Sequence, residues 1–464
     1  MRYISTRGLA PAQDFAQILL AGLASDGGLF MPEEWPQFSP ADVKRLSATA
    51  ESDYDSAATE ILSRFTGKSF SHSELLADVA GAYAGFDDER IVPLEPLGPE
   101  LFLLELFHGP TLAFKDLALQ VLGRLFARAL AKRGGRATVV VATSGDTGSA
   151  AIAALGGLPN IDVFVLHPHN RVSEVQRRQM TTSPHGNVHN IALEGTFDDA
   201  QSIVKALFAD TDFASRAHLT AVNSINFARI AAQTVYYFAA ARLDAPPIFV
   251  VPTGNFGDIF AGEAASRMGL DIEKLIIATN SNDILARALN DGVYASGRAE
   301  ATLSPSMDIQ VASNFERALF EASGRDAEWV RDAMNEFAHE KKLELPMKVL
   351  SALRDRYAAV SCNDAETLDA MARVHREFGR LIDPHTAVGM CAAFKFWKKT
   401  AGPIVVLSTA HPAKFPDAVK RATGVTPPLP PHMADLYEKK ERMSVLPNDL
   451  AAIRGFIKDR VAHS

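Results

Sequence analysis

The fold class is decided by the stretch Thr138-Val139-Val140-Val141-Ala142-Thr143-Ser144-Gly145-Asp146-Thr147-Gly148-Ser149. Its first half is an apolar, β-branched run of the kind found in buried strands. Its second half is a loop of small residues that leads into an alanine-rich helix. Because a buried strand, a glycine-containing turn and a helix form the repeating unit of parallel sheets, this stretch predicts an α/β protein.

The same order of strand, turn and helix recurs on both sides of this stretch. Further apolar strand candidates occupy residues 101–106, 161–166, 188–193, 248–251, 274–279 and 404–407. Helices are expected over about 111–132, 225–243 and 383–398. The last of these helices has a suitable N-cap and first-turn proline in Asp383-Pro384. We therefore expect mainly parallel sheets with helices on both faces.

The distribution of these elements predicts three regions. The first is a mainly helical N-terminal domain over residues 1–92. The second is a large α/β domain made of residues 93–134 and 226–464, with a helical insertion at about 281–400. The third is a smaller α/β subdomain over residues 135–225, which we expect to be mobile and to close on a substrate.

The composition narrows the class of protein. The chain has 464 residues, with 47 Lys and Arg against 55 Asp and Glu, so its net charge is −8. This acidic balance argues against a general nucleic-acid binder. The apolar runs are shorter than the roughly 20 residues that span a membrane, and the N-terminal stretch lacks the apolar core of a secretory signal. Cys362 and Cys391 are too few for a disulfide framework, so we expect a cytoplasmic protein in which both are reduced, inert packing residues.

Three polar loops directly follow predicted strands, at residues 143–149, 253–258 and 407–412. Ligands of open α/β sheets bind beyond the carboxyl ends of the strands, so these loops are candidate site elements. The small residues of the first loop stand at a helix start, where they can present amide and hydroxyl groups to an anion. The second loop can wrap amide groups around a phosphate. The third carries the hydroxyls of Ser408 and Thr409.

Each loop also has a simpler interpretation. The first loop matches neither the P-loop pattern nor the dinucleotide-binding pattern, and it can be a tight turn with a Ser or Thr cap. The second can be an ordinary surface turn between a strand and a helix. The hydroxyls of the third can bond to the local backbone. Taken one at a time, the loops leave these alternatives open.

A lysine stands among apolar residues near the start of a predicted helix. Lys115 lies between Phe114 and Asp116, with Leu117 and Ala118 next along the chain. Removal of an amine from water lowers its pKa and makes it available as a nucleophile. Alternatively, the side chain reaches solvent or pairs with Asp116.

Together these features match the requirements of one cofactor. Pyridoxal phosphate needs a lysine that forms a Schiff base, a cradle for its phosphate and a partner for its pyridine nitrogen. The Lys115 amine, the glycine-containing loops and the hydroxyls at a strand end supply these three kinds of group. The combination therefore favours a pyridoxal-phosphate enzyme.

The chain resembles the threonine synthase family of fold-type-II pyridoxal-phosphate enzymes, which have an α/β fold like that of the tryptophan synthase β subunit. The lysine segment and the segment 408–415 are specific to the family, whereas the segment around residues 144–148 is shared more widely. The segments that carry the resemblance follow the family's order along nearly the whole chain: Tyr3–Gly8, Asp26–Pro32, His108–Asp116, Ala142–Gly148, Asn223–Ile230, Gly254–Asp258, Ser313–Arg317 and Ser408–Phe415.

The resemblance implies that O-phospho-L-homoserine and water are converted to L-threonine and phosphate, by γ-elimination and β-addition. Lys115 would hold the cofactor as a Schiff base and, once displaced, would move the α-proton and a β-proton. Thr409 would face the pyridine nitrogen. The cofactor phosphate would be cradled by Gly254, Asn255, Phe256, Gly257 and Asp258, and the substrate carboxylate would be bound by Ser144, Gly145, Asp146 and Thr147.

The substrate phosphate needs cationic and polar donors. Arg317 can instead be a structural partner of Glu316 or another acid, and Arg229 can cap a helix. No metal site is expected, because the histidines show no zinc-type spacing. His411 lies near the expected cofactor site, where it can also orient the backbone. The candidates for the substrate phosphate are Asn226, Arg229, Asn314 and Arg317.

Other functions remain open at this point. A related phospho-lyase would release 2-oxobutyrate from the same substrate, and a serine or threonine dehydratase would need no phosphorylated substrate. A non-catalytic homologue would only bind a ligand. The expected partner is a small-molecule substrate, with no nucleic acid and no membrane, and the expected assembly is a monomer or a homodimer.

Overall fold

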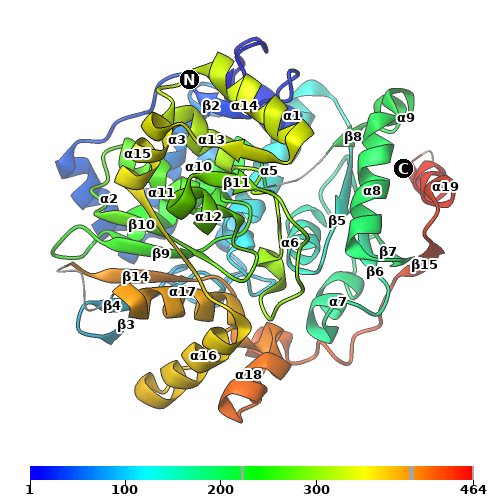
Figure 1. Cartoon of the computed structure of the whole chain (residues 1–464). Helices are drawn as coiled ribbons and strands as arrows, with labels where there is room; N and C mark the ends of the chain where they lie inside the picture. Colours follow the sequence, from blue (N-terminus) through cyan, green and yellow to red (C-terminus); the bar gives the residue numbers. More distant parts are fainter. Residues whose placement is uncertain (221–223, 397–401, 462–464) are drawn as a thin grey trace.

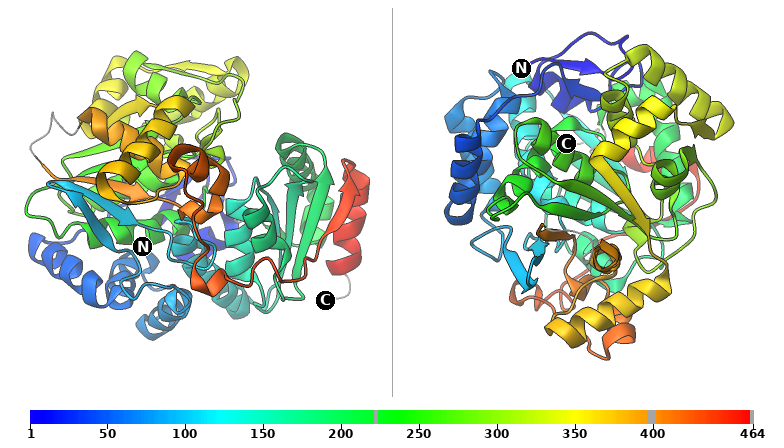
Figure 2. Two further views of the ribbon diagram at one scale, coloured as in Figure 1. Left: turned by 90° about the horizontal axis from the view of Figure 1, so that it is seen from below. Right: turned by 60° about the vertical axis from the view of Figure 1, so that its left-hand side comes forward.

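Two separate, mainly parallel β-sheets with helices around them dominate the computed structural model, which describes residues 1–220, 224–396 and 402–461 (Figure 1). Figure 2 shows the second sheet, with the C-terminal segment in red, to one side of the body that holds the first sheet. Within the described ranges, every helix is too short or too polar to serve as a membrane span.

The first sheet has six strands in the part of the chain that the structure describes. β3 is antiparallel to β4, and the other neighbouring pairs are parallel. Ile404 is in register with both Ile248 and Leu101, so β14 runs level with β9 and β4. In spatial order the strands are β13 (Tyr357–Ser361), β10 (Lys274–Thr279), β9 (Ile248–Pro252), β14 (Ile404–Ser408), β4 (Leu101–Glu105) and β3 (Leu94–Gly98).

Helices cover both faces of the first sheet, because successive strand residues point into two different apolar cores. Phe249 and Val251 belong to the core that includes residues of α10 and α11, whereas Val250 belongs to the core that includes residues of α16, α17 and α18. This is the arrangement predicted for a parallel sheet. The helices are α10 (Phe227–Ala240), α11 (Gly257–Arg267), α16 (Asp364–Phe378), α17 (Pro384–Phe396) and α18 (Pro416–Thr423).

The helix predicted from Asp383-Pro384 is α17. Asp383 caps it by accepting hydrogen bonds from the amides of His385, at 2.8 Å, and Thr386, at 3.2 Å. Residues 397–398, to which the predicted helix extends, lie outside the described residues, as does Asn223 of the family-like segments.

The second sheet is parallel, and Val139 and Val140 face opposite cores in it. Its strands, in spatial order, are β15 (Ser444–Pro447), β7 (Val188–Glu194), β6 (Ile161–Pro168), β5 (Ala137–Ala142) and β8 (Leu219–Thr220). Buried residues of α5 (Lys115–Arg133) and α6 (Asp146–Leu155) share one of these cores, and buried residues of α8 (Phe197–Ala209), α9 (Thr211–Arg216) and α19 (Leu450–Val461) share the other. A further helix, α7 (Glu174–Thr181), packs against α6.

The N-terminal region is mainly helical and packs on the first body. Its helices share the larger apolar core with α5 and α10. A short antiparallel pair, β1 and β2, joins Tyr3 to Pro32 in register. The elements are β1 (Tyr3–Ser5), α1 (Phe15–Ala21), β2 (Phe30–Pro32), α2 (Pro40–Ser52), α3 (Tyr54–Thr66) and α4 (His72–Tyr83).

The region 281–400 is not the purely helical insertion that was predicted. β13 lies within it and extends the first sheet, with Tyr357 opposite Leu275 of β10. The apolar run of β13, Tyr357–Val360, is short and contains two alanines, and only Tyr357 is buried, so it is a weak strand signal between two helices. The other elements of the region are α12 (Ile284–Asp291), β11 (Val293–Ala295), α13 (Phe315–Ala322), α14 (Ala327–Glu340), β12 (Lys342–Glu344) and α15 (Met347–Arg356).

The C-terminal segment belongs to the second sheet and not to the large domain predicted over 226–464. β15 pairs with β7, with Ser444 opposite Ile191, and α19 packs against α8 (Figures 1 and 2). Ile453 and Ile457 of α19 are buried in the core of this sheet. Local patterning cannot reveal a pairing between segments about 250 residues apart. Whether the bodies move as domains stays a prediction.

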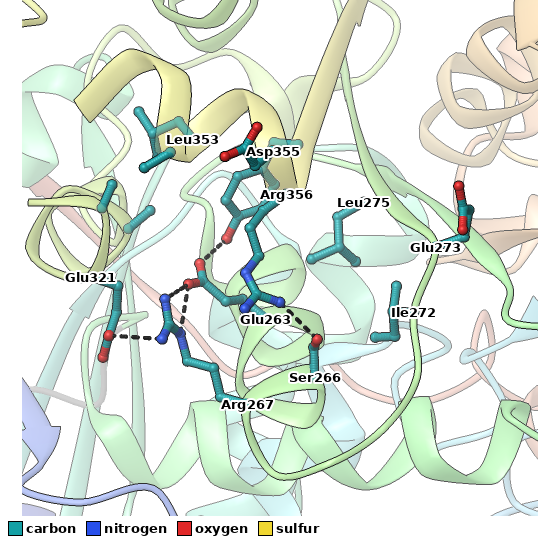
Figure 3. Close-up of a pocket in the computed structure, with 14 residues that line it drawn as sticks. Glu263, Ser266, Arg267, Ile272, Glu273, Leu275, Glu321, Leu353, Asp355 and Arg356 are labelled. Carbon is teal, nitrogen blue, oxygen red and sulfur yellow. Dashed lines mark hydrogen bonds and ion pairs between the residues drawn. The ribbon is translucent and has the colours of Figure 1, made fainter. Parts of the chain in front are cut away.

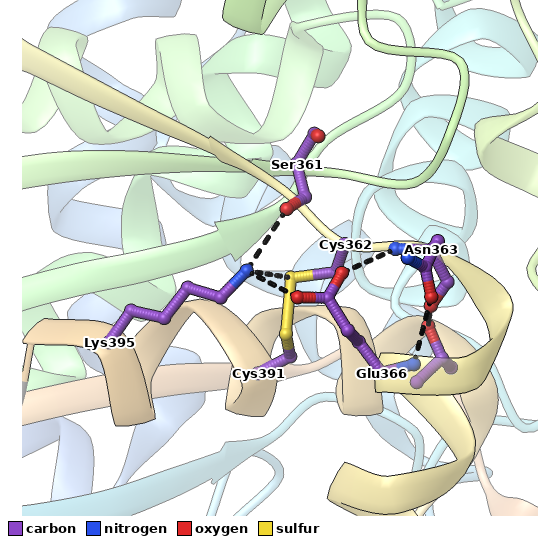
Figure 4. The surroundings of a disulfide bond; sticks show 7 residues. Ser361, Cys362, Asn363, Glu366, Cys391 and Lys395 are labelled. Carbon is purple, nitrogen blue, oxygen red and sulfur yellow. Dashed lines mark hydrogen bonds and ion pairs between the residues drawn. A yellow bond between two sulfur atoms is a disulfide. The ribbon is translucent and has the colours of Figure 1, made fainter.

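The two cysteines form a disulfide, which corrects the expectation of reduced packing residues (Figure 4). Cys362 directly follows β13 and Cys391 lies on α17, and their Cα atoms are 6.6 Å apart, a normal separation for a disulfide. Lys395 Nζ lies 2.9 Å from the Glu366 carboxylate and 3.8 Å from Cys362 Sγ. The cysteines meet because β13 and α17 pack together in the fold, which their spacing in the sequence does not show.

Candidate active site around Lys115

Lys115 is the first residue of α5, four residues later than the predicted helix start. Leu112 has a φ of 61°, a left-handed conformation that keeps the preceding turn out of the helix. The amide and the hydroxyl of Thr111 both donate to the Asp116 carboxylate, at 2.7 Å each. Asp116 therefore holds this turn together, and its alternative pairing with Lys115 is wrong.

The Lys115 amine is buried and faces a carboxylate. Its Nζ donates to Asp146 Oδ2 at 3.2 Å and lies 4.9 Å from the ring centroid of Phe114. Burial lowers the pKa of Lys115, and the charges of Arg229 and Lys414 lower it further, although Asp146 opposes them. The alternative of a lysine that reaches solvent is wrong, and the amine has the environment that a nucleophilic lysine needs.

The loop after β5 is a rigid turn with free hydroxyls at its surface. Thr143 Oγ1 accepts hydrogen bonds from the amides of Gly145 and Gly148, at 2.9 Å each. Gly145 has a φ of 141°, and a Cβ there would meet the Gln176 side chain at 2.6 Å. In contrast, Ser144 and Thr147 are partly exposed, and their hydroxyls have no hydrogen-bond partner within the described residues.

Asp146 begins α6, and four side-chain donors surround its carboxylate. Oδ1 accepts from Lys414 Nζ at 2.9 Å and from Gln176 Nε2 at 2.8 Å. Oδ2 accepts from Lys115 Nζ at 3.2 Å and from Ser306 Oγ at 2.8 Å. Burial acts to raise the pKa of Asp146, but the charges of the two lysines overcome it and hold this pKa well below the usual range.

The loop after β9 offers main-chain groups. No acceptor bonds the amides of residues 254–256 within the described part of the chain. Phe256 has a φ of 66°, and a Cβ on Gly254 would lie 2.8 Å from the Ser306 carbonyl oxygen. Asn314 supports the loop, because its amide and its side chain both donate to the Asn255 carbonyl, at 3.1 and 3.0 Å. Free amides in a left-handed turn before a helix form an anion nest.

Asp258 lies in the first turn of α11, and its carboxylate bonds to tyrosine side chains of α10. One oxygen accepts hydrogen bonds from the hydroxyls of Tyr236 and Tyr237, the latter at 3.3 Å. The other oxygen is buried and has no partner within the described residues. Burial raises the pKa of Asp258 to about 6, against the lowering effects of these hydrogen bonds and of the Arg229 and Lys115 charges.

Thr409 lies beside the lysine turn at the end of β14. Its carbonyl accepts from the Phe114 amide at 2.9 Å, and its amide donates to Thr386 Oγ1 at 3.2 Å. The Thr409 hydroxyl has no partner in the part of the chain that is described. The Ser408 hydroxyl, in contrast, lies 3.2 Å from Thr386 Oγ1. Of the two hydroxyls predicted at this strand end, the one of Thr409 is therefore available to a ligand.

His411 has a local role. Its Nδ1 accepts a hydrogen bond from the Ala413 amide at 3.1 Å and so caps a short helical turn. Its ring packs against Phe107 at a centroid distance of 5.3 Å. Burial lowers the pKa of His411 to about 4, so the ring is neutral at neutral pH. These contacts confirm the alternative that His411 orients the backbone.

Three of the four predicted phosphate ligands serve the fold. Asn226 caps α10, with its side chain accepting from the Ala228 amide at 3.0 Å. The Arg317 guanidinium is fully buried and donates to the Ile225 carbonyl, at 2.6 Å, and to the Asn314 side chain. Arg317 and Asn314 therefore brace the β9 loop, and their contact with the substrate phosphate stays a prediction that these bonds do not support.

Arg229 is the remaining candidate. It lies in the first turn of α10, it is buried, and its guanidinium has no hydrogen-bond or ion-pair partner within the described residues. Burial lowers the pKa of Arg229, but Asp258 and Tyr236 favour its charge. A buried cation without a fixed partner is suited to bind an anionic ligand.

Two site residues are not among the predicted ligands. Lys414 is fully buried and bonds to Asp146. Ser306 lies between the loops after β5 and β9. Its hydroxyl donates to Asp146, and its carbonyl oxygen lies so near Gly254 that a Cβ there would come within 2.8 Å of it. Lys414 stands in the family-like segment 408–415, which marks it as a candidate, whereas Ser306 lies in a stretch with no recognisable pattern.

Comparisons with known proteins agree along the whole chain. Three family profiles match: "Threonine synthase N terminus" at residues 2–83, "Pyridoxal-phosphate dependent enzyme" at 88–346 and "Threonine synthase, C-terminal" at 386–457. Threonine synthase of Pseudomonas aeruginosa is 49% identical over 98% of both chains. The chain belongs to the threonine synthase family. The family's Saccharomyces cerevisiae member is 40% identical over 90% of this chain and 88% of its own.

Solved structures of threonine synthases have the same fold. The pyridoxal-phosphate-bound threonine synthase from Brucella melitensis superimposes with a TM-score of 0.95, at 49% identity over 99% of both chains. The yeast threonine synthase gives a TM-score of 0.94 at 36% identity, over 100% of this chain and 99% of its own. The predicted fold-type-II class is thereby confirmed, together with the cofactor of the family.

Pyridoxal phosphate fits the residues around Lys115. The buried amine suits its aldehyde, and the free amides of residues 254–256 suit its phosphate. The cradle is narrow, because a Cβ on Gly254 would collide with the Ser306 carbonyl. The Thr409 hydroxyl, beside the lysine turn, is a free partner for the ring nitrogen. Three kinds of ligand group thus have matching partners.

A separate cavity of 340 Å³ contains none of these residues (Figure 3). It lies between α11, α13 and α15, near the amino end of β10. Three of its charged side chains pair with one another, Arg267 with Glu263 at 2.7 Å and with Glu321 at 3.1 Å. Because β9 and β10 are parallel, the cavity lies at the opposite end of the first sheet from the loop after β9.

Proposed function

We propose that this chain is a carbon–oxygen lyase that converts O-phospho-L-homoserine and water to L-threonine and phosphate. The single observation that carries the proposal is the buried Lys115 amine, 3.2 Å from Asp146, between two strand-end loops that present free donor groups. Membership of the threonine synthase family supports the choice of reaction.

The loop after β9 and the loop after β5 bind different anionic groups. The free amides of residues 254–256 bind the cofactor phosphate. The hydroxyls of Ser144 and Thr147, with the amides at the start of α6, bind the substrate carboxylate. The Asp146 carboxylate cannot share in this binding because it is itself an anion, so Asp146 contributes its amide. Arg229 is the proposed ligand of the substrate phosphate.

Bound pyridoxal phosphate supplies an electron sink that stabilises negative charge on the substrate carbons. Lys115 Nζ holds the cofactor and afterwards, as a free amine, accepts the proton from the substrate Cα. Burial lowers the pKa of Lys115, which favours the unprotonated form that a base requires. The same amine removes a proton from Cβ, and Arg229 stabilises the departing γ-phosphate. The amine returns protons to Cγ and Cα, while water adds its hydroxyl at Cβ and its remaining proton goes to the released phosphate.

Asp146 orients Lys115 during these proton transfers. It accepts a hydrogen bond from Nζ, and its other three donors fix the carboxylate from the remaining sides. A positioned carboxylate limits the rotamers of the lysine chain and directs its nitrogen toward the reacting carbons.

Product analysis tests the proposal. Purified protein with pyridoxal phosphate is incubated with O-phospho-L-homoserine, and threonine, phosphate and 2-oxobutyrate are quantified. We expect equal amounts of threonine and phosphate, and no turnover by the K115A variant. Phosphate with 2-oxobutyrate in place of threonine would assign the chain to the phospho-lyases, and turnover of serine or threonine alone would assign it to the dehydratases.

Three further expectations belong to this proposal. The body that contains the second sheet closes on the substrate, and the chain acts as a monomer or a homodimer. The enzyme works in the cytoplasm, on a small-molecule substrate and without nucleic acid. Small-angle scattering with and without a substrate analogue measures the closure and the assembly together.

A further inference from the structure

Lys414 is a fully buried lysine that transfers no proton and binds no ligand in the proposed reaction. Its Nζ lies 2.9 Å from Asp146 Oδ1, 2.7 Å from the Thr111 carbonyl and 3.2 Å from Gln179 Oε1. An ammonium group has three N–H donors, and these three acceptors use all of them. A buried charge so completely bonded has a single defined position.

The acceptors of Lys414 come from both halves of the site. Asp146 and Gln179 lie on α6 and α7, beside the second sheet, and Thr111 lies in the turn that leads to Lys115. Lys414 itself follows β14 of the first sheet. Its amine therefore links the loop after β5 to the lysine turn across the junction of the two bodies.

Asp146 lies between two lysine amines, of which one must move during the proposed reaction and the other need not. Lys115 bonds to one carboxylate oxygen, and Lys414 bonds to the other. Lys115 must turn to the cofactor and the substrate when it acts, whereas Lys414 has no reacting partner. His385 also acts on Asp146, and Arg229 acts on Lys115. Lys414 is thus the cation that stays with Asp146 throughout.

We propose that Lys414 is a positioning residue, which keeps the Asp146 carboxylate ionised and in place while Lys115 moves between its bonding partners. This inference rests on the proposed function for its role in turnover. Lys414 acts through Asp146 on the Lys115 amine, and its positive charge also offsets the attraction of Asp146 for a proton on Lys115. Removal of Lys414 therefore has two effects, a misplaced carboxylate and a more basic Lys115.

The first test measures the Lys115 amine without the cofactor. Reductive methylation of the apoenzyme, followed by peptide mass spectrometry, gives the midpoint pH at which Lys115 becomes reactive. We expect K414M to raise this midpoint by about one pH unit or more, since a buried cation near the amine is lost. D146N should lower it, and K395M, which removes a half-exposed lysine on α17, should leave it unchanged. An unchanged or lowered midpoint in K414M overturns the proposal.

The second test is a double-mutant cycle on turnover. We expect K414M to lower kcat by about 100-fold, the cost of a misplacement of about 1 Å, with a much smaller change in KM. In the D146N background the same substitution should change kcat by less than about threefold, because its target is already gone. Multiplied losses in K414M/D146N would show that Lys414 acts independently of Asp146 and would overturn the proposal.

If K414M does not fold, the double variant K414M/D146N replaces it. This variant removes both charges of the buried pair and should fold. A far-ultraviolet circular dichroism spectrum like that of D146N would show that it does. A double variant with kcat well below that of D146N then overturns the proposal. If wild-type enzyme makes no threonine, the proposed function fails, while the methylation midpoint still tests the coupling of Lys414 to Lys115.

Discussion

The loops after β5 and β9 occupy equivalent places in the two sheets, yet they present opposite chemistry. Each follows a buried parallel strand, contains glycine and leads into a helix with an aspartate in its first turn. Asp146 is surrounded by cationic and neutral donors, which hold its pKa well below the usual range. Asp258 is bonded to tyrosine hydroxyls, and burial raises its pKa to about 6.

This difference shows that strand-end topology provides a place for a site and not its chemistry. In the proposed reaction, side chains carry the function of the β5 loop, where the Asp146 carboxylate fixes Lys115. Main-chain amides carry the proposed function of the β9 loop, where a negatively charged side chain would repel the cofactor phosphate. The neighbours of each aspartate, contributed by distant segments, decide between the two.

Replacement of Lys115 should have the largest effect, because both loops converge on this amine. K115A is expected to lower kcat by about 1,000-fold or more, since the residue both holds the cofactor and transfers protons. Steady-state turnover measures the loss, and circular dichroism verifies that the fold is intact. Near-normal activity in K115A would refute the assignment of Lys115 as the residue that both loops serve.

A substitution in the β9 loop should act on cofactor binding. A Cβ on Gly254 would meet the Ser306 carbonyl at 2.8 Å, and a main-chain atom cannot move aside cheaply. G254A should therefore weaken pyridoxal-phosphate binding by about tenfold or more. The control is G186A, where an added Cβ has nothing within 4 Å. Equal affinities for these two variants, measured by fluorescence titration, would refute the main-chain cradle.

A substitution in the β5 loop should act on the substrate instead. S144A removes a free hydroxyl from the proposed carboxylate site, and we expect KM to rise by about five- to tenfold with unchanged cofactor affinity. S202A, on exposed α8, is the matched control. If S144A weakened the cofactor and left KM unchanged, the assignment of ligands to the two loops would be reversed.

The two aspartates should give opposite pH dependence of stability. A raised pKa means that folded Asp258 keeps its proton between about pH 4 and pH 6, so its contribution to stability falls as the pH rises through this range, by roughly 1.4 kcal/mol per unit. The contribution of Asp146, whose pKa is lowered, is complete above about pH 4 and falls below it. Melting temperatures of apoenzyme, D258N and D146N between pH 3 and pH 7 measure both slopes. If both aspartates changed stability with pH in the same direction, the opposite pKa shifts of Asp146 and Asp258 would be refuted.

Most strands of both sheets follow from sequence patterns, because they are buried on two faces and read as continuous apolar runs. β13 does not, because it is a half-buried edge strand, and β15 does not, because its partner β7 is about 250 residues away. The Cys362–Cys391 disulfide could not be predicted for a similar reason, since only the packing of α17 on the sheet brings the two cysteines together.

In the site, the sequence predicts Lys115, because a lysine among apolar residues near a helix start is unusual, and both loops, because small polar residues follow buried strands. It does not separate ligands from braces. Arg229 and Arg317 look alike in sequence. Only the tertiary structure shows that the Arg229 guanidinium has no partner among the described residues, whereas that of Arg317 is bonded to Ile225 and Asn314. The contact between Lys414 and Asp146 could not be predicted for a similar reason, since nothing in the sequence near Lys414 shows that its side chain reaches Asp146.

The central claim is that Lys115, and not the neighbouring buried Lys414, carries the cofactor between the two loops. Borohydride reduction of the enzyme with pyridoxal phosphate, followed by peptide mass spectrometry, locates the attachment directly. We predict that the label is found on the peptide that contains Lys115 and that it disappears in K115A. A label on Lys414, or an unlabelled Lys115 at saturating cofactor, would contradict the account.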